Sequence, residues 1–434
     1  MIINKYEPMD IQRVIYFDCQ MWNSIAYNIS AVITLVDLDI SMLENAIKLL
    51  IGEQEALRTS VEIGVDGLPI MVVHDEIEWK LKVEAMSYTG EINKNLQQII
   101  KNEISEEIEL SRVPLFRTKL VKIADNQFVF ILCMHHIISD GMSAEIFIRK
   151  MCSYYDKLRD EEIFAFRHDE GYSSFAKAEN EKLNSGKYDV KKKYWINKVV
   201  NIEPLLLPTD FIDIHKTNGL GIERRYEISK ETIESVSNAA MEQGVSLFIF
   251  FLSMFGVMLS KYTKMEKNII SVPFSYRIDE EIEETIGCFV SNMLFHFNIM
   301  DDDMIPDILR KVSRELVDVY SNINYPINRV IRHGNSSQQA SGSSVFDVCF
   351  VYDKHDKAIE STLNPAIVDQ DYVAFSGNLM FALNIRPDKN WIKILYKQEV
   401  FAMETIELMG KRYIDMIELV ANNPDICVGD INLS

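Results

Sequence analysis

The sequence lacks long hydrophobic segments, paired cysteines and a signal peptide. No apolar run in its 434 residues reaches the ~18 residues that a membrane-spanning helix needs. The N-terminal residues MIINKYEPMD contain neither a basic region nor an apolar stretch of the kind that directs secretion. The six cysteines form no CxxC pair and most lie inside apolar runs, which is typical of reduced thiols. We therefore expect a cytoplasmic protein without membrane association.

The motifs of several common ligand sites are also absent. There is neither an HExxH motif nor a Cys/His cluster, so no metal site is expected, and the glycines around Gly219 lack the third glycine of a dinucleotide-binding loop. A GxSxG motif is missing and no cysteine has an evident base, so no covalent nucleophile is expected. The net charge of −20 argues against a nucleic-acid partner. The basic run Lys191–Lys193 is expected to be the solvated face of a helix.

The composition and length indicate a soluble α/β protein of two parts. Hydrophobic residues at 47% and charged residues at 25% are ordinary for a globular protein. A chain of this length suggests two domains. Strand and helix patterns alternate in both halves, and the loop around Pro208 has the composition of a linker. We expect an α/β (α+β) fold with a boundary near residue 180, giving parts 1–180 and 181–434.

Several helices and strands can be predicted from local patterns. Ser41 and Glu44 form a capping box that predicts a helix running to about Gln54. Two apolar runs, Phe116–Ile123 and Gln127–Met134, flank a polar turn and predict a β-hairpin. In the second half the same reasoning predicts helices over Lys230–Glu242 and from an N-cap at Ser246 to Tyr262, and a buried strand over Asn268–Pro273.

The most informative stretch begins at the second strand of that hairpin. The strand ends in two adjacent histidines, His135 and His136, and four residues later come Asp140 and Gly141. Apolar positions then recur at helical spacing, so a helix is expected to begin near Gly141. A strand, a sharp turn and a helix present side chains rigidly, and the free N–H groups of the helix N-terminus lie beside them.

The histidine pair allows two interpretations. An isolated pair of histidines after a strand is more often a satisfied pair at the edge of the core. The full spacing His-His-x-x-x-Asp-Gly would occur by chance in roughly one chain in a thousand of this size. The spacing therefore favours a functional site.

The stretch resembles the HHxxxDG signature of the condensation domains of nonribosomal peptide synthetases, which are similar in fold to chloramphenicol acetyltransferase. Weaker similarities extend along essentially the whole chain. They include PMDIQ at residues 8–12, AYNI at 26–29 and EQEALRTSV at 53–61, where Arg58 matches and Glu53-Gln54 stands in place of the usual Arg-His. The run IGCFVSN at residues 286–292 resembles the family's GxFVNT motif. An expected run with Arg and Pro is replaced by residues 341–344, SGSS.

The resemblance implies a fold and a reaction. The fold would be two chloramphenicol-acetyltransferase-like lobes that form a V-shaped pseudo-dimer, with the active site at the lobe junction and HHxxxDG in the first lobe. The reaction would be attack of the amine of an acceptor aminoacyl group on a donor thioester. Both substrates would be carried on the phosphopantetheine of peptidyl carrier proteins, so the domain itself would bind no cofactor. An adenylation domain would follow the chain, which would be a monomer.

The resemblance also assigns roles to residues. His136 would accept the proton of the amine or position it, and the backbone N–H of Gly141 would stabilise the oxyanion. His135 would pack under the turn as a structural residue. Asp140 would face away from the substrate and form an ion pair with Arg277 of the second lobe. Arg58 and Asn292 would support the site.

Other functions remain open at this point. A starter condensation domain would acylate the first amino acid, and a free acyltransferase of the same fold would use acyl-CoA. A silent docking module would be expected to have a degraded histidine motif, and this motif is intact. Heterocyclisation is disfavoured because no Asp-x-x-x-x-Asp replaces the histidines. Epimerisation is disfavoured only by the AYNI and LRT similarities.

Overall fold

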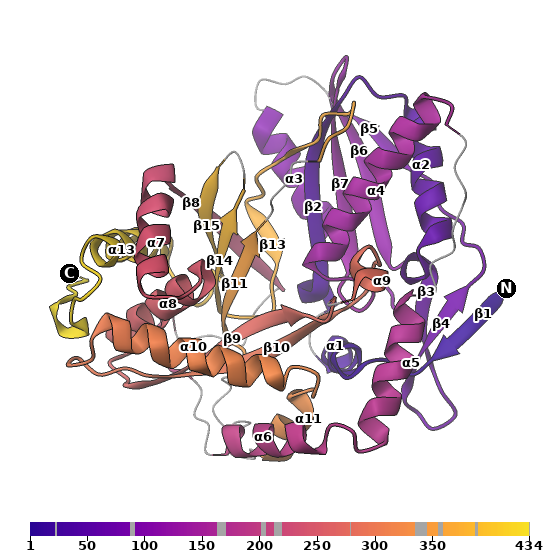
Figure 1. Cartoon of the computed structure of the whole chain (residues 1–434). Coiled ribbons are helices and arrows are strands. Elements are labelled where there is room, and N and C mark those ends of the chain that lie inside the picture. Colours follow the sequence, from indigo (N-terminus) through magenta and orange to yellow (C-terminus); the bar gives the residue numbers. More distant parts are fainter. Residues whose placement is uncertain are drawn as a thin grey trace.

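The computed structural model describes most of the chain (Figure 1). The described residues are 1–21, 24–86, 92–162, 171–200, 205–211, 219–277, 279–334, 345–354, 359–386 and 389–433. Their strands form three sheets, of five, three and seven strands. The predicted replacement of a family motif by residues 341–344 lies outside the described residues.

The five-stranded sheet carries the histidine pair. Its order is β12-β2-β7-β6-β5, and all neighbours except β5 and β6 are antiparallel. The bounds are Ala366–Ile367 for β12, Asn28–Val36 for β2, Gln127–His135 for β7, Phe116–Ala124 for β6 and Lys82–Ala85 for β5. The predicted hairpin is confirmed, since β6 and β7 pair along their whole length. β12 comes from the second half of the chain and extends this sheet at β2.

Strand β7 is continuously apolar because both faces of the sheet are covered. Phe130 and Leu132 belong to the main hydrophobic core, in which Phe130 stacks on Phe147 of α4 (Gly141–Arg159). Val129 and Ile131 point to the other face, where they pack with α3 (Ile92–Ser105). Alternate side chains of a strand point to opposite faces, so a strand between two helical layers must be apolar at every position. The end of β7 is thereby held rigidly.

Helix α2 (Ile40–Glu53) lies beside α4 on the outer face of this sheet (Figure 1). The predicted capping box is wrong. The N-cap is Asp39, whose side chain accepts a hydrogen bond from Met42 N at 2.9 Å, and Glu44 instead forms an ion pair with Lys48. Asp and Ser are equally good N-caps, so the choice between two sites two residues apart is not decided by the sequence pattern.

The remaining elements of the first half surround a small sheet. Its order is β1-β4-β3, with bounds Ile2–Tyr6, Pro69–His74 and Thr59–Ile63. The elements that complete this half are α1 (Asp10–Met21), α5 (Gly171–Asn184) and the 3-10 turns η1 (Ser24–Tyr27) and η2 (Glu55–Arg58). Helix α6 (Asp189–Val199) follows, and Lys192 and Lys193 are exposed on it as predicted, whereas Lys191 is half-buried and donates to Asn324 Oδ1 at 2.9 Å.

The seven-stranded sheet belongs to the second half. Its order is β10-β9-β11-β14-β15-β8-β13. The bounds are Val290–Asn298, Lys267–Ser275, Val348–Lys354, Leu379–Ile385, Asn390–Tyr396, Leu220–Ile228 and Tyr372–Ala374 in that order. β11 is parallel to both of its neighbours, and the other pairs are antiparallel. The predicted strand at Asn268 is therefore confirmed and is longer than expected at both ends.

Helices pack on this sheet (Figure 1). They are α7 (Lys230–Glu242), α8 (Leu247–Thr263), α10 (Ile305–Ser321) and α13 (Met403–Asn422), with the short α9 (Glu280–Glu283), α11 (Asn328–Gly334) and η3 (Val428–Asp430) in the connections. Both predicted helices are confirmed, including the N-cap at Ser246, whose hydroxyl accepts from Ile249 N at 3.3 Å. No single helix of the described residues is long and apolar enough to cross a bilayer; α7 and α8 reach that composition only as a pair bent by 98°.

Candidate active site

The turn between β7 and α4 brings the HHxxxDG residues together. β7 ends at His135 and α4 begins at Gly141, as predicted, and Asp140 is the N-cap of α4. Within the turn, Ile138 N donates to His135 O at 3.0 Å and the Ser139 hydroxyl donates to the same oxygen at 3.0 Å. These short-range hydrogen bonds fold the turn tightly against the strand end.

His135 is fully buried under the turn, which is the position that the resemblance implied. Its Nδ1 accepts a hydrogen bond from Ile137 N at 3.1 Å, so the ring proton must be on Nε2, which faces Cys19 Sγ at 3.6 Å. Burial, with smaller contributions from the nearby His136 and Arg117, lowers the pKa of His135 to about 3. His135 is therefore a neutral core residue with no access to a substrate.

His136 is half-buried and has the opposite tautomer. Its Nδ1 lies 2.7 Å from the carbonyl oxygen of Ser139. A carbonyl can only accept, so Nδ1 carries the proton and Nε2 of the neutral ring carries the lone pair. The ring of Tyr27 lies edge-on at 6.5 Å, and Cys288 Sγ lies 3.8 Å from Nδ1. His136 therefore presents a proton acceptor at Nε2.

Asp140 is occupied by four hydrogen bonds and is 2% exposed. Oδ1 accepts from Ser143 N at 2.9 Å and from the Ser143 hydroxyl at 2.8 Å. Oδ2 accepts from Arg277 Nη1 at 2.5 Å and from Phe289 N at 3.1 Å. A carboxylate engaged in this way caps α4 and is not aimed at a substrate.

Arg277 lies in the second half of the chain and completes this cluster. Its side chain is 1% exposed and forms the ion pair with Asp140 that the resemblance implied. Its Nη2 donates to Ser143 Oγ at 3.0 Å and to Gly287 O at 3.2 Å, and the guanidinium lies 4.3 Å from the centre of the Phe289 ring. The charge is thus paired, hydrogen-bonded and packed on an aromatic face, which are the conditions under which a buried ion pair is tolerated.

Residues 284–289, the Glu284–Phe289 segment, connect the two halves. Gln54 Oε1 accepts from Ile286 N at 2.7 Å, and the Tyr172 hydroxyl donates to Cys288 O at 3.0 Å. A Cβ at Gly287 would lie 2.0 Å from the Tyr172 ring, so only glycine fits there. Gln54, Ser143 and Tyr172 were not predicted as residues of the site. For Gln54 the sequence offered one indication, since a polar residue stands there at a position where the family usually has His.

Gly141 is the first residue of α4. A Cβ added to it would meet no atom within 4 Å, so the protein itself leaves the space in front of it open. The N–H of the first helical residue has no carbonyl oxygen within the helix to bond to, because the i→i−4 hydrogen bonds begin further along. Gly141 can therefore offer an N–H to a ligand at the positive end of α4.

Arg58 and Asn292 are not brought to the turn. Arg58 is buried and donates to the carbonyl oxygens of Ile51 at 2.9 Å and Asp75 at 3.0 Å, which ties the end of α2 to the end of β4. Asn292 is half-buried on β10 opposite Pro273. Within the described ranges, neither side chain has a hydrogen bond to the residues of the turn. Their predicted support of the site remains a prediction.

Two other features bear on the chemistry. Cys288 is a buried thiol, and burial and the nearby Asp140 raise its pKa well above the ordinary value, which makes it a poor nucleophile. The part of the chain that the structure describes contains no group of three or more His, Cys, Asp and Glu side chains that could hold a metal ion.

Comparisons with known proteins show which family the chain belongs to. Residues 2–434 match the family model described as "Condensation domain". The chain is 27% identical over 417 residues to tyrocidine synthase 3 of Brevibacillus parabrevis, which covers 95% of the chain but 6% of that protein. Gramicidin S synthase 2 of Brevibacillus brevis is 27% identical over 414 residues, or 94% of the chain and 9% of that protein. The chain thus spans less than a tenth of the length of these two relatives.

Solved structures with this fold were also found. The first condensation domain of the calcium-dependent antibiotic synthetase, in complex with a substrate analogue, superposes with a TM-score of 0.85 at 15% identity and full coverage of both chains. The four-domain nonribosomal peptide synthetase AB3403 gives 0.84 at 15% identity, over the whole chain and 34% of that protein. These similarities confirm the mixed α/β fold with three sheets, of the chloramphenicol-acetyltransferase-like type.

Proposed function

This chain belongs to the condensation-domain family of nonribosomal peptide synthetases, the amide-bond-forming acyltransferases, and we propose that His136 and Gly141 carry its reaction. The observation that supports this most directly is the tautomer of His136. Its Nδ1–H is held by Ser139 O at 2.7 Å, which leaves the lone pair on Nε2, and Ser139 lies two residues before α4 begins at Gly141. An imidazole in this tautomer can accept a proton at Nε2.

The proposed step is direct aminolysis of a thioester. The acceptor amine attacks the donor carbonyl carbon, the C–N bond forms and the C–S bond breaks. The amine proton passes to His136 Nε2 and from there to the departing thiolate sulfur, so the products are an amide and a free thiol. The N–H of Gly141 would stabilise the oxyanion of the tetrahedral intermediate, because it lies at the positive end of α4. A thioester is already activated, so no covalent enzyme intermediate is required.

Both substrates are proposed to be attached to carrier proteins, and the domain itself is proposed to bind no cofactor. The donor acyl or peptidyl group and the acceptor aminoacyl group would each be linked to the phosphopantetheine of a peptidyl carrier protein. A following adenylation domain and a location in the cytoplasm are part of the same proposal, as is a monomeric state. The relatives are many times longer than the chain, which is what a domain acting among carrier domains would give.

The finer architecture belongs to this proposal. Two lobes, 1–180 and 181–434, would form a V with the active site at their junction. The ion pair of Asp140 and Arg277 supports this, because it joins residues of the two parts that are 137 positions apart, and Asp140 belongs to the same turn as His136. If the two halves separated, each charged group would lose its partner, and a buried charge without a partner lowers stability.

The reaction is tested by intact-mass analysis of two carrier proteins. One carrier is loaded with an acyl or aminoacyl donor and the other with an acceptor amino acid, and both are incubated with the chain. We expect the donor mass to move to the acceptor carrier. Transfer from acyl-CoA alone would instead indicate a free acyltransferase, and transfer only of fatty acyl donors would indicate a starter domain. Absence of transfer with every donor and acceptor pair would contradict the proposal.

A further inference from the structure

Helix α1 supports the turn between β7 and α4 from outside it. In Figure 1, α1 lies below the lower end of β2, the strand that pairs with β7 up to His135. Gln12, Ile15 and Cys19 follow one another at intervals of three and four residues, so their side chains share one face of the helix. Gln12 and Ile15 are buried, and Cys19 Sγ lies 3.6 Å from His135 Nε2. This face of α1 is therefore packed against the turn.

The side-chain amide of Gln12 joins the start of α1 to the middle of the turn. Its Oε1 accepts a hydrogen bond from Met9 N at 2.9 Å, and its Nε2 donates to Ile137 O at 2.7 Å. A backbone N–H can only donate and a carbonyl can only accept, so the two partners fix which end of the amide is oxygen and which is nitrogen. Gln12 is the third residue of α1, so one end of its amide caps its own helix and the other end holds the turn.

The peptide group that Gln12 holds lies between His136 and the residue that sets its tautomer. Ile137 follows His136, and two residues later Ser139 O lies 2.7 Å from His136 Nδ1. A rotation of the peptide group at Ile137 would move Ser139 O relative to the imidazole ring. On the other side, His136 N donates to Tyr27 O at 2.7 Å, so the backbone is held both before and after the His136 carbonyl. With Gln12 in place, the ring keeps its proton on Nδ1 and its lone pair on Nε2.

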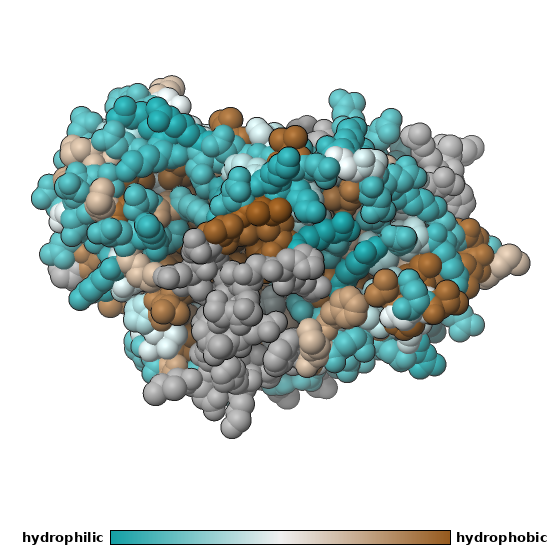
Figure 2. All heavy atoms as spheres, turned by 90° about the horizontal axis from the view of Figure 1, so that it is seen from below, coloured by the Kyte–Doolittle hydropathy of each residue, from teal (hydrophilic) through white to brown (hydrophobic). Residues whose placement is uncertain are grey.

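Water cannot take over the hydrogen bond from Gln12 to the turn. The side of the molecule that lies below α1 in Figure 1 is seen directly in Figure 2 and is mostly hydrophilic. Gln12 and Ile137 are both 0% exposed and contribute nothing to that surface. A buried carbonyl that loses its donor is unfavourable, so the turn would move until Ile137 O met another one. An apolar side chain at position 12 is therefore expected to change the geometry of the turn.

We propose that Gln12 is a positioning residue for the reaction at His136. It acts through the backbone, by holding Ile137 O so that Ser139 O keeps the proton of His136 on Nδ1. Gln12 lies 125 positions before Ile137, and the resemblance of PMDIQ at residues 8–12 gave it no role. The proposal rests on the proposed function, since it concerns the residue that accepts the proton of the amine.

The test removes both hydrogen bonds of Gln12 at nearly constant volume. Methionine has a similar length and neither an N–H nor a C=O in its side chain, so Gln12→Met leaves Met9 N and Ile137 O without this partner. If that variant does not fold, Gln12→Asn takes its place, since its amide is one carbon too short to span both groups. Each variant is compared with the unmodified chain by denaturant unfolding and is used at a temperature at which it is folded.

Asn180→Leu is the matched control. Asn180 is a buried residue of α5, and its Nδ2 donates to Glu7 O at 3.1 Å and to Pro8 O at 3.5 Å. It is thus a buried amide that holds the segment leading into α1, as Gln12 does, but its two hydrogen bonds go to that segment and not to the turn. Asn180→Leu is expected to lower stability without changing the tautomer of His136.

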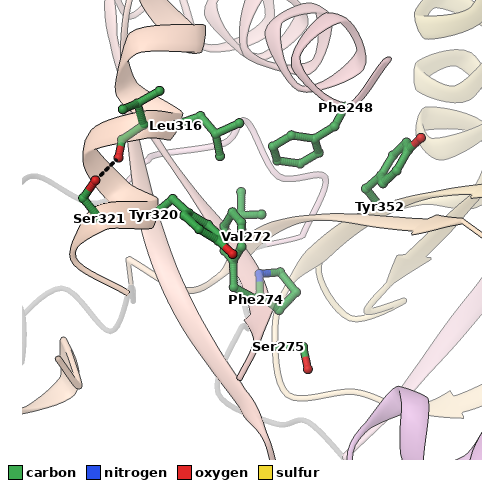
Figure 3. A pocket seen from close by; sticks show the side chains of 10 residues that line it. Phe248, Val272, Phe274, Ser275, Leu316, Tyr320, Ser321 and Tyr352 are labelled. Atoms are coloured by element: carbon green, nitrogen blue, oxygen red, sulfur yellow. Dashed lines mark hydrogen bonds between the residues drawn. The ribbon is translucent and has the colours of Figure 1, made fainter. Parts of the chain in front are cut away.

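A second control lowers stability in the other half of the chain. An apolar cavity of about 560 Å³ lies between α8, β9, α10 and β11, with Leu316 on one side and Phe248 and Tyr352 on the other (Figure 3). All the lining residues that the structure describes belong to the second half. Phe248→Leu enlarges this cavity, so it lowers stability by loss of packing. It shows what a general loss of stability does to the measurements.

Two measurements are made on the folded proteins. Nuclear magnetic resonance of ¹⁵N-labelled histidine, recorded at alkaline pH where an imidazole is neutral, reports which ring nitrogen carries the proton. The His136 signals are identified by their loss in His136→Ala. We expect a mixture of the two neutral tautomers of His136 in Gln12→Met, and the Nδ1–H form in the unmodified chain and in both controls.

The second measurement is condensation between loaded carrier proteins, analysed as kcat and KM. We expect kcat of Gln12→Met to fall roughly tenfold or more with KM changed less than about twofold, because a displacement of about 1 Å at the reacting group can cost about a hundredfold in rate. The kcat of Asn180→Leu and of Phe248→Leu should stay within about twofold of the unmodified chain, since neither residue contacts the turn.

The two measurements together decide the proposal. Mixed tautomers together with a lower kcat in Gln12→Met, and in neither control, support it. The proposal is overturned if His136 stays in the Nδ1–H form in Gln12→Met, if kcat of that variant is unchanged, or if kcat falls equally in all three variants. If the unmodified chain condenses no pair of substrates, the proposed function fails, and the resonance measurement still shows whether Gln12 positions the ring.

Discussion

The turn between β7 and α4 and the Glu284–Phe289 segment lie against each other but are held in different ways. The turn is fixed in large part by its own residues: Ile137 donates to His135, His136 to Ser139, and Ser143 to Asp140, all within three positions, although Gln12 and Arg277 add distant hydrogen bonds. The segment is fixed by residues far away in the sequence, among them Tyr172 at 116 positions and Gln54 at 232 positions. The comparison suggests that the turn carries the chemistry and the segment holds the turn in place.

This division predicts that a change at His136 affects rate and not stability. His136 is half-buried, and its ring makes one short hydrogen bond, to Ser139 O within the turn, and a longer contact with Cys288 Sγ, so His136→Ala should fold normally. Loss of an acid–base group typically lowers the rate by ~10²–10⁴, and we expect a loss of this size in the carrier-protein assay. His135→Ala is the control, since that buried ring should affect the melting temperature instead. Unchanged turnover of folded His136→Ala would remove His136 from the mechanism.

The contact between turn and segment is expected to carry stability. Removal of either Asp140 or Arg277 strands a buried charge, and we expect Asp140→Ala and Arg277→Ala each to lower the free energy of unfolding by about 3–5 kcal/mol. The double variant should lose less than the sum of the two, because it leaves no unpaired charge. Denaturant unfolding of all four proteins measures this.

The opposite assignment of Asp140 gives a different pattern. If Asp140 were the catalytic base, Asp140→Asn would fold normally and abolish turnover, and Arg277→Ala would have little effect. Additive losses of stability in the double-mutant cycle would also contradict the structural role. The four hydrogen bonds already accepted by the carboxylate are the reason to expect coupling.

The same difference explains how much could be predicted from the sequence. The hairpin, the start of α4 and the helix over Lys230–Glu242 were predicted because their patterns are local. The pairing of Asp140 with Arg277 came from the family resemblance, since 137 positions separate them and no pattern in the sequence links them. Ser143 and Tyr172 were missed for this reason. The N-cap of α2 was wrong because two good capping residues stand two positions apart.

A residue that holds the segment without any charge should give a smaller effect. Gln54 is 1% exposed and accepts from Ile286 N at 2.7 Å, so Gln54→Ala leaves a buried N–H without an acceptor. We expect a loss of about 1–3 kcal/mol in the free energy of unfolding. Gln98→Ala on the exposed side of α3 is the matched control and should change stability by less than about 0.5 kcal/mol. Equal effects of the two substitutions would show that the segment does not depend on Gln54.

The last effect is small per pH unit; it concerns the buried histidine of the turn and appears as a dependence of stability on pH. The pKa of His135 is about 3 in the folded protein and near 6.5 in the unfolded chain, so the folded state binds fewer protons between these values. Stability from this group is complete above about pH 6.5 and declines as the pH falls toward 3, by on the order of 1 kcal/mol per pH unit. The ring faces Cys19, His136 and Arg117, and none of these supplies a negative charge that would favour protonation. Denaturant unfolding between pH 7 and 4 should therefore show a shallower slope in His135→Asn than in the unmodified chain. His296, whose pKa burial lowers to about 4, contributes a separate share that this substitution leaves in place. An unchanged slope in His135→Asn would mean that the turn opens and hydrates His135 before the protein unfolds, and the turn would then be a less rigid support for His136 than its local hydrogen bonds indicate.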